Sequence, residues 1–398
     1  MNHPRGAGSL VLPALVLTLL GCTPTTQPDP PAQPFVFREL NLRRQDEQGR
    51  PLWELSSPET RYDLSRKLAQ SRDLTGVLYE QGQPRYRFSA ANGVVLNDGE
   101  LVQLEGPIRL ERLDPERPLL LTGQRLRWYP DEERMEIDRA PRATSADLQL
   151  SAGLARFLIA EDRLELRQGP LLLQAGVEPL QLALGEVDWT LSTALLQARG
   201  PIRGQRRLSG GGLQRLTAPA LSGDTRAQTI DLQPPVRLED PQRQAVINAR
   251  ATRLDLPSRQ AISREPFQGR YGSTSFQGGG FRLDALNEIL VVENGCRLEQ
   301  PGDQLQAGRC RWDWGSGEVE ASGAVRLQRQ DDGLATTAER LVGRIGTDGF
   351  AEFSSPGGQV RSELRLPTDA GGSGAVPFSG DRDPARRGGR TRAPAFQL

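Results

Sequence analysis

Few residues in this sequence have the types and spacing that catalysis requires. The only histidine is His3. It lies in a segment that we expect to be removed, so the mature chain has no imidazole for general-base, metal-binding or pH-switch roles. The acidic groups Asp131-Glu132-Glu133 and Glu161-Asp162 could pair as glycosidase carboxylates. They fall at predicted turns, where a solvated charge run is the ordinary interpretation. We therefore expect no enzyme activity, no metal site and no cofactor.

Two other residue patterns that can bind ligands have simpler interpretations. Gly210–Gly212 and Gly278–Gly280 lack the Lys-Ser/Thr pair and the strand-to-helix context of a phosphate-binding loop, so we interpret them as loops. Trp312-Asp313-Trp314 could form a sugar-stacking surface, but the two indoles more simply share one face of a strand. The 50 Lys and Arg residues balance 50 Asp and Glu residues, so electrostatic binding of nucleic acid is not expected.

The three cysteines have two different expected roles. Cys22 directly follows Leu19-Leu20-Gly21, which is similar to a bacterial lipobox and predicts lipidation of the cysteine thiol. Cys296 and Cys310 are predicted to face inward on the two strands of one hairpin. In an oxidising compartment they fit a cross-strand disulfide, and they also fit two buried thiols that act as small apolar residues.

Both ends of the chain read as segments outside a folded body. The apolar run Leu10–Leu20 has 11 residues, whereas a membrane span needs about 20. With the lipobox it predicts a lipoprotein signal peptide at residues 1–21. Residues 22–34 contain five prolines and predict an extended tether. Residues 367–398 are rich in Gly, Pro and Arg and predict a disordered tail.

The middle of the chain is a tandem repeat. One phrase, a Gly or Pro followed by an apolar residue, often Arg, and then Leu, recurs nine times at a mean spacing of 31 residues. Gly106-Pro107-Ile108-Arg109-Leu110 and Gly323-Ala324-Val325-Arg326-Leu327 are two clear copies. A second phrase with a small residue and apolar alternation lies half-way through most repeats. The alternation has the period of a strand, so we predict two strands per repeat. Such hairpins cannot bury an apolar face alone, and we expect them to stack into one elongated curved sheet.

A sheet of this kind that folds over on itself would have one apolar seam inside it. A closed seam is a core, and a parted seam is a slot for lipid. The candidate lining residues are Trp53, Leu55, Val77, Phe88, Val94, Ile108, Leu110, Leu126, Leu171, Ile202, Val236, Phe267 and Val325.

Residues 46–113 resemble the LptC family of the Gram-negative lipopolysaccharide export machine. The resemblance rests on Gln48-Gly49-Arg50-Pro51-Leu52-Trp53-Glu54-Leu55, Thr60-Arg61-Tyr62, Arg85-Tyr86-Arg87-Phe88-Ser89-Ala90 and Leu96-Asn97-Asp98-Gly99-Glu100-Leu101, followed by Leu104-Glu105-Gly106-Pro107-Ile108. It implies an LptC-like domain over residues 35–150, and further repeats over residues 151–366 that resemble the LptA/OstA-like group and the periplasmic part of LptD. The implied fold is all-β, an elongated open β-jellyroll (β-taco) of antiparallel hairpins.

The resemblance also implies a function and partners. The chain would hold lipopolysaccharide, or a similar glycolipid, by its acyl chains. It would receive this lipid from inner-membrane ABC exporter components and pass it to an LptA-like or LptD-like β-jellyroll by edge-strand pairing. The implied location is the periplasm. The family favours the inner membrane for the anchor, whereas Thr23 after the lipidated cysteine fits the outer membrane.

Two alternatives from other functional classes stay open. A carbohydrate-active or carbohydrate-binding β-repeat protein would have a polar groove lined by acids. A structural envelope lipoprotein would have a sealed core with no affinity for amphiphiles. The alternating apolar positions favour an apolar groove over a polar one, whereas binding of an amphiphile is what separates the lipid carrier from the structural lipoprotein.

Overall fold

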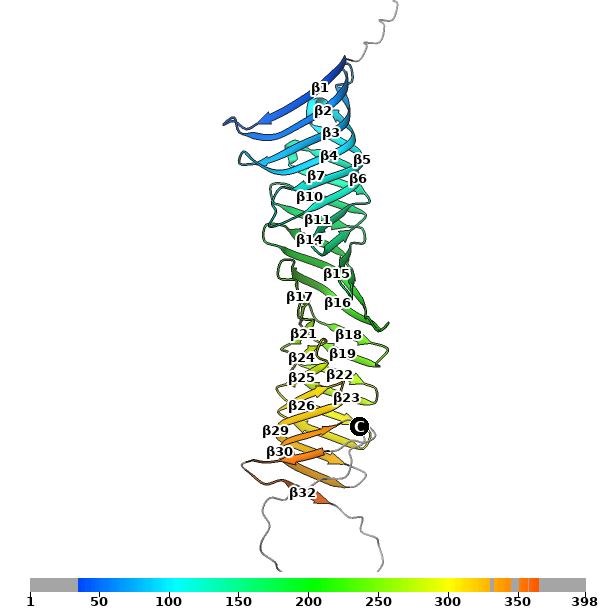
Figure 1. Ribbon diagram of the computed structural model, residues 1–398, viewed down its shortest axis with the longest axis vertical. Helices are drawn as coiled ribbons and strands as arrows, with labels where there is room; N and C mark the ends of the chain where they lie inside the picture. Colours follow the sequence, from blue (N-terminus) through cyan, green and yellow to red (C-terminus); the bar gives the residue numbers. More distant parts are fainter. Residues whose placement is uncertain (1–34, 330–332, 345–350, 357, 365–398) are drawn as a thin grey trace, which may run out of the picture.

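The computed structural model describes residues 35–329, 333–344, 351–356 and 358–364. The predicted signal peptide, Cys22, the tether and the tail lie outside the described residues. The described part is an elongated stack of antiparallel strands, with β1 at one end and β32 at the other (Figure 1). The predicted all-β, elongated β-jellyroll is confirmed.

Ten strands are long and bend near their middle. In the β5–β6 pair, for example, the register shifts between Glu105 and Ile108. Gly106 lies in this bend with a φ of +92°, a left-handed conformation that glycine adopts without the steric cost of a Cβ atom. The ten bent strands are β1 (Phe35–Gln45), β2 (Pro51–Asp63), β3 (Leu68–Glu80), β4 (Gln83–Leu96), β5 (Leu101–Arg112), β6 (Leu120–Tyr129), β15 (Leu195–Arg207), β16 (Leu213–Asp224), β29 (Glu318–Arg329) and β30 (Leu334–Arg344).

Elsewhere the chain breaks at the bend, so that two separate short strands replace one bent strand. The bend divides the sheet into two facing layers, which we call wall 1 and wall 2. Wall 1 consists of one half of each bent strand and one set of short strands. Its short strands are β7 (Arg134–Arg139), β10 (Leu154–Leu158), β11 (Arg163–Arg167), β14 (Glu186–Thr190), β17 (Thr229–Leu232), β20 (Thr252–Asp255), β21 (Gln260–Ser263), β24 (Gly280–Asp284), β25 (Ile289–Glu293), β28 (Arg309–Asp313) and β31 (Ala351–Ser354).

The other halves and the other short strands form wall 2. Its short strands are β8 (Arg142–Ser145), β9 (Leu148–Ser151), β12 (Leu171–Gln174), β13 (Leu180–Ala183), β18 (Val236–Asp240), β19 (Ala245–Ala249), β22 (Phe267–Tyr271), β23 (Thr274–Gly278), β26 (Cys296–Gln300), β27 (Asp303–Ala307) and β32 (Arg361–Leu364). Two short 3-10 turns, η1 (Asn97–Gly99) and η2 (Pro130–Glu132), complete the elements.

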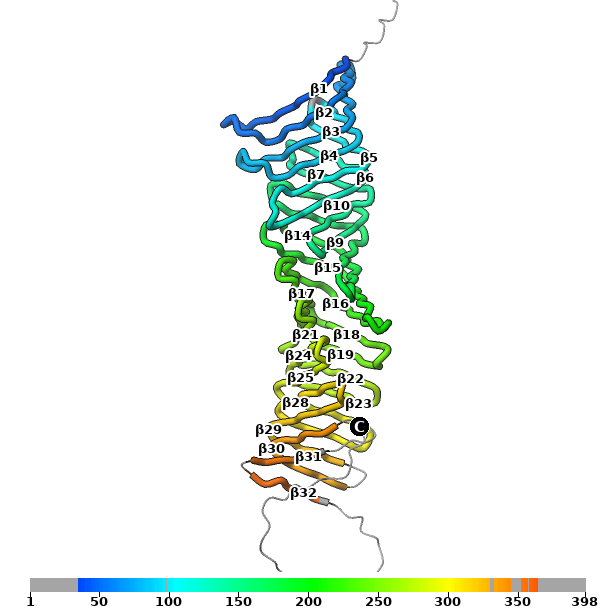
Figure 2. Tube along the Cα trace, in the orientation of Figure 1, coloured from blue at the N-terminus to red at the C-terminus, as the bar shows by residue number. Residues whose placement is uncertain are grey.

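The prediction of two strands per repeat is wrong for most of the chain. From β17 to β28 the chain forms two consecutive strands in one wall and then two in the other. Each repeat there therefore contains four short strands. The reason is that the Gly/Pro phrase marks the bend, which we call the crease, and not a hairpin turn. The hairpin turns lie at the strand ends that are remote from the crease, and they form one row on each wall. The two rows face each other along a line that we call 'the seam'. Figure 2 shows the chain zigzagging along this stack.

The apolar core lies between the inner faces of the two walls. Two clusters of buried side chains continue one another along the stack, one from Leu55 to Val236 and the next from Ile247 to Leu341. Large inward side chains fit where the neighbouring strand has a glycine, which has no side chain to fill the same space. A Cβ atom on Gly76 would lie 2.2 Å from the ring of Phe88, so only glycine fits beside this ring.

Candidate functional site

Aromatic side chains from the two walls meet in the interior. Phe88 on wall 2 packs edge-on against Trp128 on wall 1, with ring centroids 5.6 Å apart. Further along the stack, Tyr271 on wall 2 packs against Trp312 on wall 1 at 4.8 Å. Because such edge-to-face pairs add to the burial of apolar area, the walls hold each other closed along the interior.

Nine of the predicted lining residues are buried in this interior. They are Leu55, Phe88, Ile108, Leu110, Leu126, Ile202, Val236, Phe267 and Val325, each no more than 3% exposed. Trp53 is half-buried and packs against the same cluster, in edge contact with Trp128.

Three predicted lining residues lie on the outer face instead. Val77 pairs with Glu54 and Arg87 on the outside of wall 2, while its neighbours Gly76 and Leu78 are buried. Val94 and Leu171 lie outward in the same way, with Val95 and Leu172 buried beside them. The cause is the period of two: the residue before each of them, Gly76, Gly93 or Pro170, takes the buried position, so the next residue lies on the other face.

The interior contains hydrogen-bond donors that lack acceptors. The chain has five tryptophans. In all five, the indole Nε1 is buried and has no hydrogen-bond partner among the residues that the structure describes; they are Trp53, Trp128, Trp189, Trp312 and Trp314. Buried polar groups in folded proteins are nearly always paired. An apolar interior with unpaired donors therefore suits an amphiphile whose ester or amide carbonyl groups can accept hydrogen bonds. Trp312, in β28, and Trp314, which directly follows this strand, both pack against the second core cluster.

A buried ion pair crosses the seam in the first half of the molecule. Asp162 lies in the wall 1 turn between β10 and β11 and is 8% exposed. On wall 2, the Arg112 guanidinium and the Tyr86 hydroxyl both donate hydrogen bonds to its carboxylate. Arg85 Nη2 lies 3.4 Å from Asp162 Oδ2. Burial, followed by the charge of Asp162, raises the pKa of the Tyr86 phenol, so this hydroxyl remains protonated and donates.

A second group of charges crosses the seam near the middle of the chain. Glu178, in the wall 2 turn between β12 and β13, pairs with Arg259 in the wall 1 turn between β20 and β21, at 3.0 Å. The backbone N–H of Ser209 donates to Glu178 at 3.0 Å and is the main reason that the Glu178 pKa is lowered. Burial, reinforced by the charge of Arg259, lowers the pKa of Arg206. Glu178 thus pairs with the guanidinium of Arg259 and also acts electrostatically on that of Arg206.

Two exposed ion pairs tie the seam at other points. Arg44 of β1 on wall 2 pairs with Asp131 in the wall 1 turn after β6. Arg243, after β18 on wall 2, pairs with Glu288, before β25 on wall 1, at 2.9 Å. We call these two pairs, with Arg112–Asp162 and Arg259–Glu178, the seam ion pairs. They restrict access to the apolar interior from the side.

Sequence reasoning missed most of these residues. The solvated-turn interpretation is wrong for Asp162, which is buried. It holds for Asp131 and Glu161, which are exposed and pair with Arg44 and Arg163. Among the described residues, no group of three or more His, Cys, Asp or Glu side chains could hold a metal ion.

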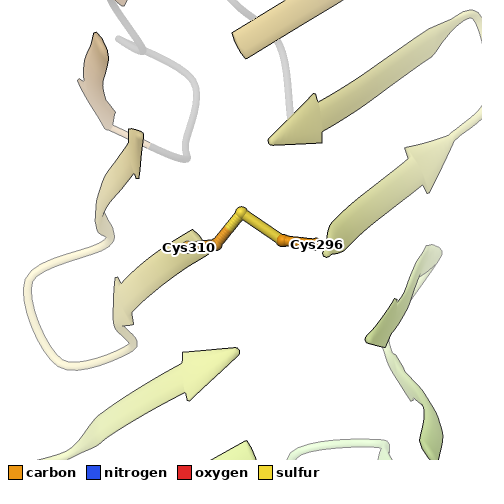
Figure 3. The surroundings of a disulfide bond; sticks show 2 residues. All are labelled: Cys296 and Cys310. Atoms are coloured by element: carbon orange, nitrogen blue, oxygen red, sulfur yellow. A yellow bond between two sulfur atoms is a disulfide. The ribbon is translucent and has the colours of Figure 1, made fainter. Parts of the chain in front are cut away.

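A disulfide joins the two walls beside the crease. Cys296 begins β26 on wall 2, and Cys310 lies in β28 on wall 1; their Cα atoms are 5.9 Å apart (Figure 3). The prediction that they occupy one hairpin is wrong, because Cys296 pairs with Ala307 and Cys310 with Ala321. Of the two states left open by the sequence, the disulfide is the one present.

Together, the bent strands, the continuous apolar interior and the charged seam define an elongated β-jellyroll protein with two walls. Residues 11–169 match the family model described as Lipopolysaccharide-assembly, LptC-related. The N-terminal part of the chain is thus similar to this family, whose description names lipopolysaccharide assembly. Family members are periplasmic and associated with the inner membrane. A search of curated proteins found no match. No helix among the described residues is long and apolar enough to cross a membrane.

Proposed function

We propose that this protein is a membrane-anchored carrier that holds the acyl chains of lipopolysaccharide between its two walls. The observation that carries the proposal is the continuous apolar interior, in a chain whose first part matches a lipopolysaccharide-assembly family. The chain makes and breaks no covalent bond in this role. Its task is to replace water around the acyl chains with apolar side chains, at about 25 cal/mol per Å² of apolar surface.

The lipid enters through the seam in this proposal. The acyl chains displace wall-to-wall contacts, and the sugar headgroup stays outside, beyond the seam ion pairs. The unpaired indole N–H groups then donate to carbonyl groups of the acyl linkages. Opening at the seam while the crease stays intact provides space without unfolding either wall.

In this proposal, lipopolysaccharide is transferred to and from neighbouring proteins at the two ends of the stack. Among the described strands, β1 pairs only with β2, so its other edge offers free backbone donors and acceptors. Phe35, Val36 and Phe37 on this strand are 57%, 59% and 45% exposed. We propose that the inner-membrane exporter docks at this end by edge-strand pairing. An LptA-like or LptD-like β-jellyroll then adds to the other end, beyond β31 and β32.

The anchor completes the proposal. Lipidation of Cys22 would tether the β1 end of the body to a membrane by more than one acyl chain, which stable anchoring requires. The family favours the inner membrane. Labelling cells with a radioactive fatty acid, in the wild type and in Cys22→Ala, tests the lipidation directly, and membrane fractionation identifies the membrane.

The decisive experiment compares substitutions on the two faces of the same wall. Ile108→Asp and Val236→Asp place a carboxylate in the interior, whereas Val77→Asp and Leu171→Asp place one on the outer face. Purified full-length protein is titrated with lipopolysaccharide and with a fluorescent fatty-acid probe. The carrier proposal expects the inward substitutions to abolish binding and the outward ones to preserve it. Equal effects on both faces, or no binding by the wild type, would refute it.

An inward aspartate can also unfold the protein, so a second measurement avoids this ambiguity. A photo-crosslinking residue at Leu126, which is buried, or at Val94, which faces outward, is irradiated in intact cells. Crosslinks to lipopolysaccharide from position 126 and none from position 94 support the interior as the binding site. The reverse pattern contradicts the proposal. A sealed structural core gives no crosslink at either position.

A further inference from the structure

The arginine that recurs in the repeat phrase has no part in the interior. In Ile108-Arg109-Leu110, both apolar residues point inward and Arg109 is exposed on wall 2. The same holds for Arg203, Arg237, Arg297 and Arg326 in their copies of the phrase. Packing of the core therefore does not explain why arginine recurs at this position.

The strand register places these arginines in a single line. Each residue of the line is the direct cross-strand neighbour of the next, from one end of wall 2 to the other. The line runs Asn41, Ser56, Thr75, Ser89, Arg109, Thr122, Arg142, Ser151, Leu171, Ala183, Arg203, Thr217, Arg237, Asn248, Gln268, Gln277, Arg297, Gln306, Arg326, Thr337 and Arg361. We call it the arginine line. It has seven arginines and no acidic residue.

The outer face of wall 1 is different. Its corresponding line mixes arginines with acidic residues, as in the stretch Arg127–Glu136–Arg156–Glu165–Asp188. Opposite charges pair there; Arg156, for example, lies 2.9 Å from Glu136. On the arginine line, Arg237, Arg297 and Arg361 pair with a glutamate two residues further along the same strand. Among the described residues, no carboxylate pairs with Arg109, Arg142, Arg203 or Arg326.

A groove lies on this line. It has a volume of about 780 Å³ and spans β19, β22, β23, β26 and β27 beside the crease. The side chains Asn248, Gln268, Gln277 and Gln306 line it together with Arg250 and Arg297. Carboxamides both donate and accept hydrogen bonds, as sugar hydroxyl groups do. Guanidinium groups bind carboxylates in a bidentate geometry.

We propose that the arginine line and its groove bind a linear acidic polysaccharide along the outside of wall 2. Successive arginines are two or four strands apart, about 10 or 19 Å at the usual strand spacing. A regular line one residue wide matches a chain with repeating carboxylates, whereas a flat membrane would need charges spread across a face. The site is separate from the interior, and the proposal does not depend on lipid binding.

The test uses the detergent-solubilised full-length chain and three probes: polygalacturonate, neutral dextran and phosphatidylglycerol vesicles. The triple variant Arg203→Gln, Arg297→Gln and Arg326→Gln is compared with the matched control Arg253→Gln, Arg282→Gln and Arg311→Gln, which removes the same number of charges from wall 1. We expect the wild type and the control to bind polygalacturonate, with affinity that falls as salt rises. The triple variant should bind about tenfold more weakly, because each exposed charge pair contributes little alone.

Each other outcome overturns the proposal. An equal loss in the control assigns binding to net charge instead of the line. Equal affinity for dextran removes the role of the carboxylate, and preference for the vesicles assigns the face to a membrane. Absence of polygalacturonate binding at low salt removes the site altogether. Circular dichroism of both variants confirms that the β fold is intact.

Discussion

The buried ion pair at Asp162 provides the sharpest test of the seam. The substitution Asp162→Asn keeps the size of the side chain and an oxygen that accepts from Tyr86, but it removes the charge opposite Arg112. The Arg112 side chain is 2% exposed, so its guanidinium would remain buried without a counter-charge. Breaking a buried pair in this way costs roughly 3–5 kcal/mol. At the lower end of that range, about 3 kcal/mol, seam opening becomes more frequent by on the order of 100-fold.

Hydrogen exchange followed by mass spectrometry measures this opening. Peptides that cover the turn between β10 and β11 should exchange on the order of 100-fold faster in the variant, while peptides from β26 to β28 should not change. The control is Asp231→Asn, which breaks an exposed pair worth at most about 1 kcal/mol and leaves the seam intact. Uptake of a fluorescent fatty acid should be faster in Asp162→Asn. Unchanged exchange at the turn, or a uniform increase along the chain, would refute the seam as the place of opening.

Two further predictions follow from the other contacts between the walls. The Glu178 pKa is lowered, mainly by the Ser209 backbone N–H, so the charged carboxylate stabilises the fold above its ordinary pKa of 4.5 and loses this effect as the pH falls through the lowered value. The difference in urea midpoint between wild type and Glu178→Gln should therefore be full at pH 7 and shrink as the pH falls below the ordinary pKa of Glu178; a difference that does not shrink in acid contradicts this. Replacing Cys296 and Cys310 by alanine removes a covalent link between residues 14 apart, which should lower the free energy of unfolding by about 3 kcal/mol. Hydrogen exchange should become faster in β25–β28 but not in β4–β6, and unchanged exchange in β25–β28 would contradict this prediction.

The overall architecture could be predicted because its determinants are local. Alternation with a period of two and a phrase repeated about every 31 residues predict stacked antiparallel strands. The burial of Ile108, Ile202, Val236 and Val325 follows directly from their place in the phrase. The extent of the LptC-like domain at residue 150 remains a prediction, since the strands continue through that position without a break.

The orientation of residues near the crease could not be predicted in the same way. Whether a bend inserts an extra residue decides which face the next side chain occupies, and the phrase looks the same in both cases. Ile108 follows Gly106 and Pro107 and points inward, whereas Leu171 follows Gly169 and Pro170 and points outward, because Pro170 takes the buried position. Only the strand register distinguishes the two.

The contacts across the seam left no pattern in the sequence at all. Asp162 lies 50 residues from Arg112 and 76 residues from Tyr86, and Glu178 lies 81 residues from Arg259. Separations of more than one repeat give no local signal. Asp162 is therefore interpreted from the sequence as part of an ordinary solvated turn, and Glu178 does not stand out in the sequence at all.

These sequence separations indicate how the molecule can open. Beside the crease, the disulfide joins residues 14 apart, whereas contacts at the seam join residues up to 87 apart. Closing a longer loop costs more conformational entropy, and the crease is also held by a covalent bond. The seam relies on ion pairs, two of them exposed, which solvent and salt weaken. The crease is thus the stable hinge and the seam the weaker edge. A carrier for acyl chains needs this distribution of stability, because it must part its walls locally while both remain folded.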